Sequence, residues 1–244
     1  RTVNKLNAKR YFLYANFMEY KVAFKLDFKR NTFPGKFIVI EGIGGAGKTT
    51  QVALAGYYLE SIGRIPRLTR EPGGVTPSEV IRRLIFRLVQ EKVANPDHQI
   101  ALFFAARDFW VREFVAANIG VGQDVLSDRS YPSTVAYQGY GEGADLKGID
   151  KWVDIVMGEY KPDAIILLDV GVNIAKTRVD ADDDPYDYKD GEWFERVIEG
   201  YRTMARQNWS NVPWFVVDGE QSIAKVSEEV NQVLSEIITR AVLR

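Results

Sequence analysis

The pattern of apolar residues predicts a three-layer α/β/α fold, in which a five-stranded parallel sheet carries helices on both faces. Short apolar segments alternate with longer stretches of helical periodicity from residue 37 onward, as expected for parallel strands joined by helices. The first segment, "KFIVIE" at 36–41, is almost continuously apolar, which is typical of a strand buried on both faces. No internal repeat or low-complexity linker interrupts residues 37–244, so we expect one domain there.

The remaining strands are expected at 65–70, 122–128, 162–170 and 211–219. A helix is expected over 49–62, where the apolar residues at helical spacing are Val52, Ala55, Tyr58, Leu59 and Ile62. The next helix, 76–89, has Thr76 as its expected N-cap and Pro77 as its first residue. A long helix over 95–120 opens at Asn95 and closes at Gly120. The last helix follows Ser222, with one apolar face made of Ile223, Val226, Val230, Val233 and Ile237.

The composition of the 244 residues is that of an ordinary globular protein, with 46% hydrophobic and 27% charged residues. A net charge of −1 gives no basis for general affinity toward nucleic acid, and no apolar run approaches the length of a membrane span. The absence of cysteine excludes disulfides and thiol nucleophiles, and the single histidine, His98, excludes a His-rich metal site. We therefore expect a cytoplasmic protein without nucleic-acid or membrane partners.

Residues 1–36 differ from the rest of the chain in charge, because they hold nine Lys or Arg residues and two acidic ones, a net charge of +7. A basic, acid-poor start is also found in targeting segments, but this one lacks serine and is rich in Phe and Tyr. Residues 19–30 alternate in polarity, which favours an added strand or a loosely ordered arm over a targeting helix. We expect a basic N-terminal extension over 1–36.

A glycine-rich loop connects the first strand to the first helix, and Gly42 to Thr49 fit the P-loop spacing G-x-x-x-x-G-K-T. Its backbone N–H groups can surround phosphate oxygens, Lys48 adds a positive charge, and the Thr49 hydroxyl is a Mg²⁺ ligand. The motif predicts binding of a nucleoside triphosphate with Mg²⁺, without separating kinases from GTPases, ATPase motors or transporter subunits. The residues expected to surround the triphosphate are Gly42, Gly44, Gly45, Ala46, Gly47, Lys48, Thr49 and Thr50.

Three further segments narrow the class: "TREPGG" at 69–74, "LFFAAR" at 102–107 and "LSDRSYPSTVAYQ" at 126–138. Together with the loop they resemble the thymidylate kinase family of P-loop nucleoside monophosphate kinases. The resemblance implies a mobile lid at about 178–195, a homodimer, and transfer of the γ-phosphate of ATP to dTMP, which gives dTDP and ADP for dTTP biosynthesis. Spacing alone predicts only a nucleotide or nucleoside kinase.

The resemblance assigns the reacting phosphates to four residues: Lys48, Arg70, Asp128 and Arg129. Arg70 and Arg129 are implied to hold the dTMP phosphate, since two guanidinium groups can give several charge-assisted hydrogen bonds. Asp128 ends a predicted strand, where ligands of open parallel sheets bind, and is implied to lie near Mg²⁺ together with Thr49. The plainer interpretations are a surface arginine for Arg70 and an ion pair with Arg129 for Asp128.

The resemblance also places the nucleoside of dTMP beside the long helix. Phe103 and Arg107 lie four residues apart on one helix face, and are implied to stack on thymine and to reach a base oxygen. Tyr137 is implied to exclude a ribose 2′-hydroxyl, and Arg178 to pack on the adenine of ATP. The other residues implied to line the acceptor pocket are Ser133 and Gln138. Core packing for Phe103 and a helix-surface position for Arg178 are the alternatives.

The sequence departs from the family pattern at four positions. Gly44 replaces an Asp or Glu that normally contacts the acceptor sugar, and Val75 replaces a common Thr, which is a milder change. Gly45 and Pro185 stand where family members carry a catalytic arginine, in the loop or in the lid. An arginine that meets transition-state charge is worth about 10³ to 10⁵ in rate. We expect the missing arginine to be replaced by a group of the basic extension or by Lys189, Arg196 or Arg202.

Two alternatives to dTMP kinase therefore stay open. Loss of a carboxylate at Gly44 favours a kinase for another deoxynucleoside monophosphate or for a deoxynucleoside. Loss of the arginine favours a catalytically weak, nucleotide-binding paralogue. A dTMP kinase needs no general base, because a phosphate monoester is largely ionised near neutral pH. It works by positioning, by charge stabilisation and by a lid that excludes water.

Overall fold

The computed structural model of the chain describes residues 32–178, 186 and 189–242. It contains a five-stranded, all-parallel sheet in the order β2-β3-β1-β4-β5. The strands are β1 (Phe37–Glu41), β2 (Arg67–Arg70), β3 (Val125–Asp128), β4 (Ala164–Asp169) and β5 (Trp214–Asp218). All five predicted strands are present, and the predicted fold class is confirmed. Most of the expected extension over 1–36 lies outside the described residues, including the strand suggested within 19–30.

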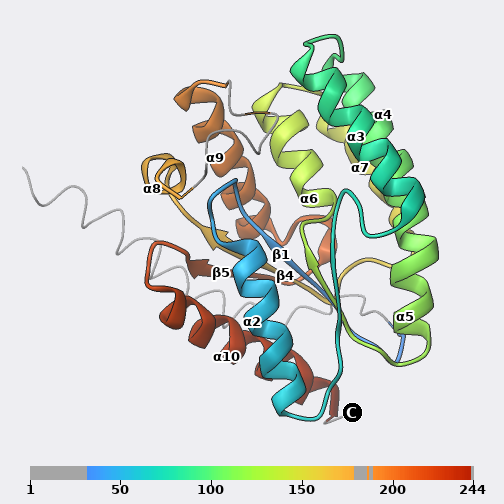
Figure 1. Cartoon of the computed structure of the whole chain (residues 1–244), viewed down its shortest axis with the longest axis vertical. Helices are drawn as coiled ribbons and strands as arrows, with labels where there is room; N and C mark the ends of the chain where they lie inside the picture. Colours follow the sequence, from blue (N-terminus) through green and yellow to red (C-terminus); the bar gives the residue numbers. More distant parts are fainter. Residues whose placement is uncertain (1–31, 179–185, 187–188, 243–244) are drawn as a thin grey trace, which may run out of the picture.

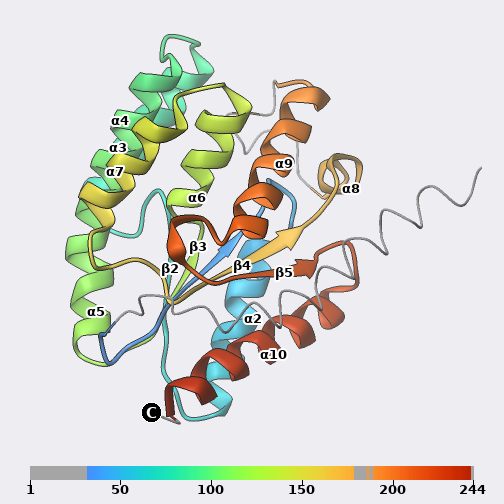
Figure 2. The same ribbon diagram turned by 180° about the vertical axis from the view of Figure 1, so that it is seen from behind.

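Helices cover both faces of the sheet, as a continuously apolar central strand requires. Figures 1 and 2 show α2 (Lys48–Ser61) and α10 (Ile223–Val242) together on one side. On the opposite side lie α3 (Thr76–Gln90), α4 (Pro96–Trp110), α7 (Leu146–Met157) and α9 (Gly191–Gln207). Strand β1 is buried along its whole length, so the loop that follows it begins from the centre of the sheet.

The predicted long helix over 95–120 is present as one run of three segments. Helix α4 continues into a π-helical turn, η2 (Val111–Val115), and then into α5 (Ala116–Gly120). The side chain of Asn95 accepts a hydrogen bond from His98 N over 2.9 Å, which confirms the expected helix start.

The expected N-cap at Thr76 is wrong by one residue. The extended residue Val75 precedes α3, and its carbonyl already accepts a hydrogen bond from Glu79 N over 3.0 Å. Val75 is therefore the N-cap, while Thr76 and Pro77 are the first two helical residues.

Several helices were not anticipated from the sequence. They are α6 (Tyr131–Thr134) with its π-helical continuation η3 (Val135–Gly141), α7, α8 (Val172–Lys176), α9 and the 3₁₀ turn η4 (Trp209–Asn211). The start signals of α7 and α9 are nevertheless regular, because Asp145 and Asp190 cap them through their side chains.

Candidate active site

The predicted motifs meet at one edge of the sheet. In parallel strands all carboxyl ends lie on the same side, so the segments that follow β1, β2 and β3 are neighbours. The register brings Asp128 of β3 opposite both Ile40 of β1 and Arg70 of β2. The glycine-rich loop, "REPGG" and "DRSYPS" therefore border a common space, although they lie far apart in sequence.

The glycine-rich loop owes its path to backbone conformations that glycine permits. Gly42 has φ +145°, and a Cβ added there would lie 2.7 Å from the carbonyl oxygen of Leu168 on β4. Gly47 has φ +90° at the start of α2. Lys48 is buried, and its Nζ donates to the carbonyl of Ile43 over 2.8 Å, so the side chain folds back over the loop.

Two oxygen ligands suited to Mg²⁺ lie together where α2 starts and β3 ends. Thr49 Oγ1 donates to Asp128 Oδ2 over 2.5 Å, and the Thr49 side chain is exposed. The described residues contain no cluster of three or more His, Cys, Asp or Glu side chains that could hold a metal. One hydroxyl and one carboxylate fit Mg²⁺, because this ion takes much of its octahedral shell from water and substrate phosphates.

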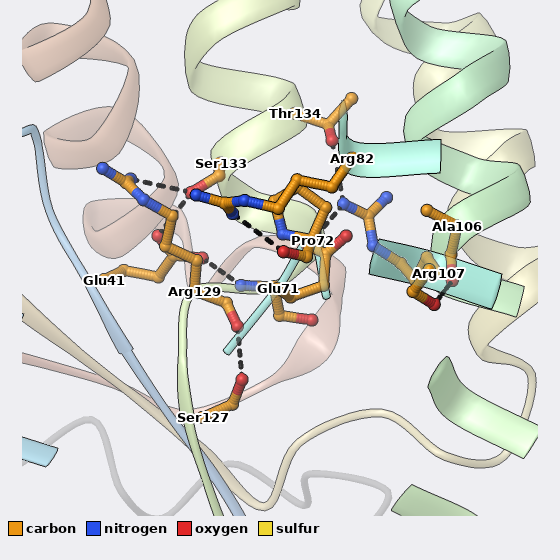
Figure 3. Close-up of polar contacts among 12 residues, drawn as sticks. Glu41, Glu71, Pro72, Arg82, Ala106, Arg107, Ser127, Arg129, Ser133 and Thr134 are labelled. Atoms are coloured by element: carbon orange, nitrogen blue, oxygen red, sulfur yellow. Dashed lines mark hydrogen bonds and ion pairs between the residues drawn. The ribbon is translucent and has the colours of Figure 1, made fainter. Parts of the chain in front are cut away.

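Arg129 is held at the centre of the site by a network that the sequence did not reveal. It has φ +74°, and its Nη1 donates to Gly42 O over 2.8 Å, Ser133 Oγ over 3.1 Å and Tyr201 Oη over 3.3 Å. The fully buried Glu41 accepts from Ser130 N and Ser133 Oγ, both over 2.8 Å, and from Tyr201 Oη over 3.0 Å. Figure 3 shows Arg129 and Ser133 beside Glu41. Glu41 thus orients the groups that accept from Arg129.

The electrostatics of Glu41 follow from its position. Burial raises the pKa of this carboxyl, while the Arg129 guanidinium and the three hydrogen bonds act in the opposite direction. The sequence carried a signal for this residue, because Glu41 is a charge at the end of an otherwise apolar strand.

Arg70 lies at the rim of the site and is mostly exposed. Its Nη2 lies 3.1 and 3.3 Å from the two carboxylate oxygens of Glu79, which also accepts from Gly74 N over 3.0 Å. Arg82 of α3 donates to Pro72 O over 2.8 Å. Burial lowers the pKa of Arg82, and the nearby positive charges of Arg70 and Arg129 lower it further. Three guanidinium groups therefore converge on this part of the site.

No sequence motif points to Arg82, although helical periodicity gives a signal for it. The buried residues of α3 include Ser78, Ile85 and Val89, and position 82 falls on the same stripe at spacings of three or four. A charge on a core-facing stripe is uncommon unless it serves a site or a buried partner.

Arg107 is fully buried on α4. Its Nη2 donates to Glu71 Oε2 over 2.8 Å and to Thr134 Oγ1 over 2.9 Å, as Figure 3 shows. Its Nε and Nη1 have no hydrogen-bond partner among the described residues, nor does Glu71 Oε1. Phe103 lies one turn earlier on the same helix and is 8% exposed. Buried donors without partners are costly, so the surroundings of Arg107 are suited to a ligand that supplies acceptors.

An aromatic cluster surrounds Tyr137, whose hydroxyl contacts Arg129. Tyr137 makes edge-on ring contacts with Tyr186, Trp193 and Tyr201, and its hydroxyl accepts from Arg129 Nη2 over 3.3 Å. Gln138 donates to the Tyr186 hydroxyl over 2.8 Å. Tyr137, Ser133 and Gln138 therefore lie in one connected set of side chains with Arg129.

Arg178 belongs to a different neighbourhood. It is exposed, and its Nη1 donates to Gly219 O over 2.8 Å, in the turn after β5. Half of the expected lid at 178–195, including Pro185, lies outside the described residues.

The three side chains expected to replace the missing arginine have different surroundings. Lys189 Nζ pairs with Glu142 over 2.7 Å, and Arg196 Nη2 donates to Gly141 O over 3.2 Å. Arg202 pairs with Asp169 over 3.1 Å at the carboxyl end of β4. Burial raises the pKa of Asp169, and the pairing with Arg202 acts against that rise. Of the three, Arg202 is the one paired at the carboxyl end of β4, the strand next to β1 and the glycine-rich loop.

Comparison with known proteins gives a consistent result. Residues 40–230 match the family model described as thymidylate kinase. The thymidylate kinase of Nostoc punctiforme is 34% identical over 207 residues, which cover 84% of this chain and 95% of the relative. That of Kosmotoga olearia is 35% identical over 196 residues, covering 80% and 92%.

A solved structure agrees with the sequence relatives. The crystal structure of thymidylate kinase from Ehrlichia chaffeensis superposes with a TM-score of 0.69 at 31% identity, covering 82% of this chain and 98% of that one. In the described part of the chain, no helix is both long and apolar enough to cross a membrane. The matched length, the identity and the shared fold show that the chain belongs to the thymidylate kinase family.

Proposed function

We propose that this protein transfers the γ-phosphate of ATP to dTMP, giving dTDP and ADP. The observation that carries the proposal is the buried Arg107, whose Nε and Nη1 lack partners in the described structure and which lies one helical turn from Phe103. A flat aromatic ring beside unpaired donors suits a pyrimidine base with carbonyl oxygens. A loop that binds only a triphosphate would need neither residue.

The acceptor phosphate is proposed to bind where the arginines converge. Arg129 is oriented by Ser133, Tyr201 and the Gly42 carbonyl, so its guanidinium needs little reordering when a phosphate arrives. Arg70 is proposed to leave Glu79 and close over the phosphate, since an exposed ion pair is weak. Tyr137 is proposed to exclude a ribose 2′-hydroxyl.

The donor side is proposed to use the glycine-rich loop. Backbone N–H groups and Lys48 would hold the ATP phosphates, with Arg178 packing near the adenine. Thr49 and Asp128 would hold Mg²⁺, which when bound neutralises charge on the phosphates. The acceptor oxygen needs no general base, because a phosphate monoester is largely ionised near neutral pH. Arg202 is proposed to replace the arginine absent at Gly45, since Asp169 holds it at the strand end next to the loop.

We also propose a homodimer. Exposed apolar side chains occur on three helices that lie side by side in both views, α3, α4 and α7 (Figures 1 and 2). They are Val80, Leu84, Phe109, Trp152 and Ile155. A second copy would cover this surface, which sedimentation of the purified protein tests directly.

The test of the reaction is ADP release from ATP and Mg²⁺ with dTMP, compared with dUMP, dGMP, thymidine and no acceptor. Release that requires dTMP and is lost in Lys48→Ala supports the proposal. Lys161→Ala is the matched control, because Lys161 pairs with Asp154 on the surface of the protein. If release is faster with thymidine or with another monophosphate, that compound and not dTMP is the acceptor. Binding of dTMP without release would refute catalysis, and an Arg202→Ala variant with undiminished release would refute the role of Arg202.

A further inference from the structure

A closed set of hydrogen bonds lies near the start of α4, where Gln99, Gln138 and Tyr186 meet. Gln138 Nε2 donates to Gln99 Oε1 over 3.1 Å and to the Tyr186 hydroxyl over 2.8 Å. The Tyr186 hydroxyl donates in turn to Gln99 Oε1 over 2.8 Å. All three side chains are buried, and they come from α4, from η3 and from the expected lid. Such a set links segments that are distant in sequence.

A fourth residue, Ala94, determines which atoms of this set donate and which accept. Gln99 Nε2 donates to the backbone carbonyl of Ala94 over 3.1 Å. A carbonyl oxygen can only accept, so the amide nitrogen of Gln99 faces Ala94 and its Oε1 faces Gln138 and Tyr186. That oxygen needs donors, and Gln138 therefore turns its NH₂ group toward it. The Ala94 carbonyl thus sets the orientation of the Gln138 amide by way of Gln99.

This orientation leaves the other end of the Gln138 amide as an acceptor. The bonds to Gln99 and Tyr186 are both donated by Gln138 Nε2, so its Oε1 lies on the other side of the amide, where it can accept from a ligand. If the amide were reversed, two oxygens would face each other inside a buried site. An acceptor–acceptor contact of this kind is costly where water cannot intervene.

The Gln138 Oε1 acceptor comes from η3 and lies beside one end of a row of residues on α4. Gln99, Phe103 and Arg107 are successively four residues apart, so they share one helix face, with a rise of about 6 Å between neighbours. The Arg107 end offers unpaired donors, and the Gln99 end holds the Gln138 acceptor. Phe103 lies between them, where a base would stack.

We propose that Gln99 and Tyr186 are specificity-determining positioning residues, which hold Gln138 so that the pocket accepts a base with a ring N–H beside a carbonyl. This inference rests on the proposed function and deepens it. Thymine presents a carbonyl oxygen to a donor and a ring N–H to an acceptor. Cytosine presents an amino group and a bare ring nitrogen on the same edge, which mismatch Arg107 and Gln138 in turn.

The test compares dTMP with 5-methyl-dCMP, which has nearly the same shape but reverses donor and acceptor on that edge. The full chain and its variants are assayed for kcat/KM with both acceptors. Tyr186→Phe keeps the ring and removes the hydroxyl, so the dTMP preference should fall about tenfold. Gln99→Leu should lower it at least as far, because Gln138 can then rotate. Gln99→Glu should keep the dTMP preference of the unaltered chain, since a protonated carboxylic acid can donate to the Ala94 carbonyl and accept from Gln138.

Asn95→Ala is the matched control, because it removes the side-chain cap on His98 N and keeps the backbone carbonyl that accepts from Gln99 N. Its preference ratio should equal that of the unaltered chain. The inference fails if Tyr186→Phe and Gln99→Leu lower kcat/KM for both acceptors equally, since that is the effect of a purely structural role. If Gln99→Leu does not fold, Tyr186→Phe decides, because its backbone lies outside any helix or strand. If the unaltered chain does not phosphorylate dTMP, the proposed function itself is refuted.

Discussion

The glycine-rich loop and the proposed acceptor site of this protein are built in opposite ways. The loop is a run of consecutive residues, Gly42 to Thr49, whose path depends on glycines with positive φ. The pocket is assembled from side chains of β1, α4, η3 and α9, such as Glu41 and Tyr201, which are 160 residues apart. A backbone site should be broken by adding a Cβ, whereas an assembled site should be broken by removing one buried polar group.

The largest effect is expected from Gly42→Ala, compared with Gly47→Ala. A Cβ at Gly42 would lie 2.7 Å from Leu168 O, whereas at Gly47 nothing lies within 4 Å. Both changes place alanine at positive φ, which costs about 1–2 kcal/mol. Only Gly42→Ala must also displace the loop or β4, so we expect it to abolish ATP binding in a titration. Gly47→Ala should weaken binding about tenfold. Equal losses would mean that backbone strain alone decides the loop's affinity.

The next largest effect is expected from Glu41→Ala, which tests the assembled pocket. The change leaves Ser130 N, Ser133 Oγ and Tyr201 Oη without their common acceptor, and an unpaired buried group costs about 1–3 kcal/mol. We expect kcat/KM for dTMP to fall about 100-fold through the misplacement of Arg129, while ATP affinity is unchanged.

Glu199→Ala is the control for Glu41→Ala, since it removes an exposed carboxylate from α9. Glu41→Gln should be intermediate, because an amide keeps the shape but offers a donor where three donors converge. A parallel loss of ATP affinity in Glu41→Ala would show that the loop and the pocket are not separable.

The same contrast explains what could be predicted from the sequence. The strands and the glycine-rich loop are local, so periodicity and spacing were enough to find them. Phe103 and Arg107 share a helix face, and the family resemblance pointed to them. Gln99 and Tyr186 gave no comparable signal, because their role depends on contacts between segments brought together only by the fold. Thr76 was misplaced because helix boundaries depend on backbone hydrogen bonds that composition does not fix.

The smallest effect is expected at the exposed rim of the pocket, from Glu79→Gln. Burial pushes the pKa of Glu79 upward, but the hydrogen bond from Gly74 N and the ion pair with Arg70 outweigh it, so the pKa lies below the ordinary 4.5. A depressed pKa means that the charged form favours the folded state. Glu79 therefore contributes to stability above its unfolded pKa, and this contribution is lost as the pH falls through its folded pKa.

Glu79→Gln should accordingly lower the free energy of unfolding near neutral pH by at most about 1 kcal/mol, since exposed ion pairs are weak. Urea denaturation at stepwise lower pH should show the two proteins converging below pH 4.5, where Glu79 is protonated in the unfolded chain. Glu91→Gln is the matched control, because Glu91 pairs with Arg87 at the end of the same helix, within a surface i,i+4 pair. If Glu79→Gln lowers the free energy of unfolding no more than this control does, the hydrogen bond from Gly74 N adds no stability. The backbone turn would then hold the rim, as backbone conformation holds the glycine-rich loop. A larger cost would show that side-chain assembly extends to the edge of the pocket.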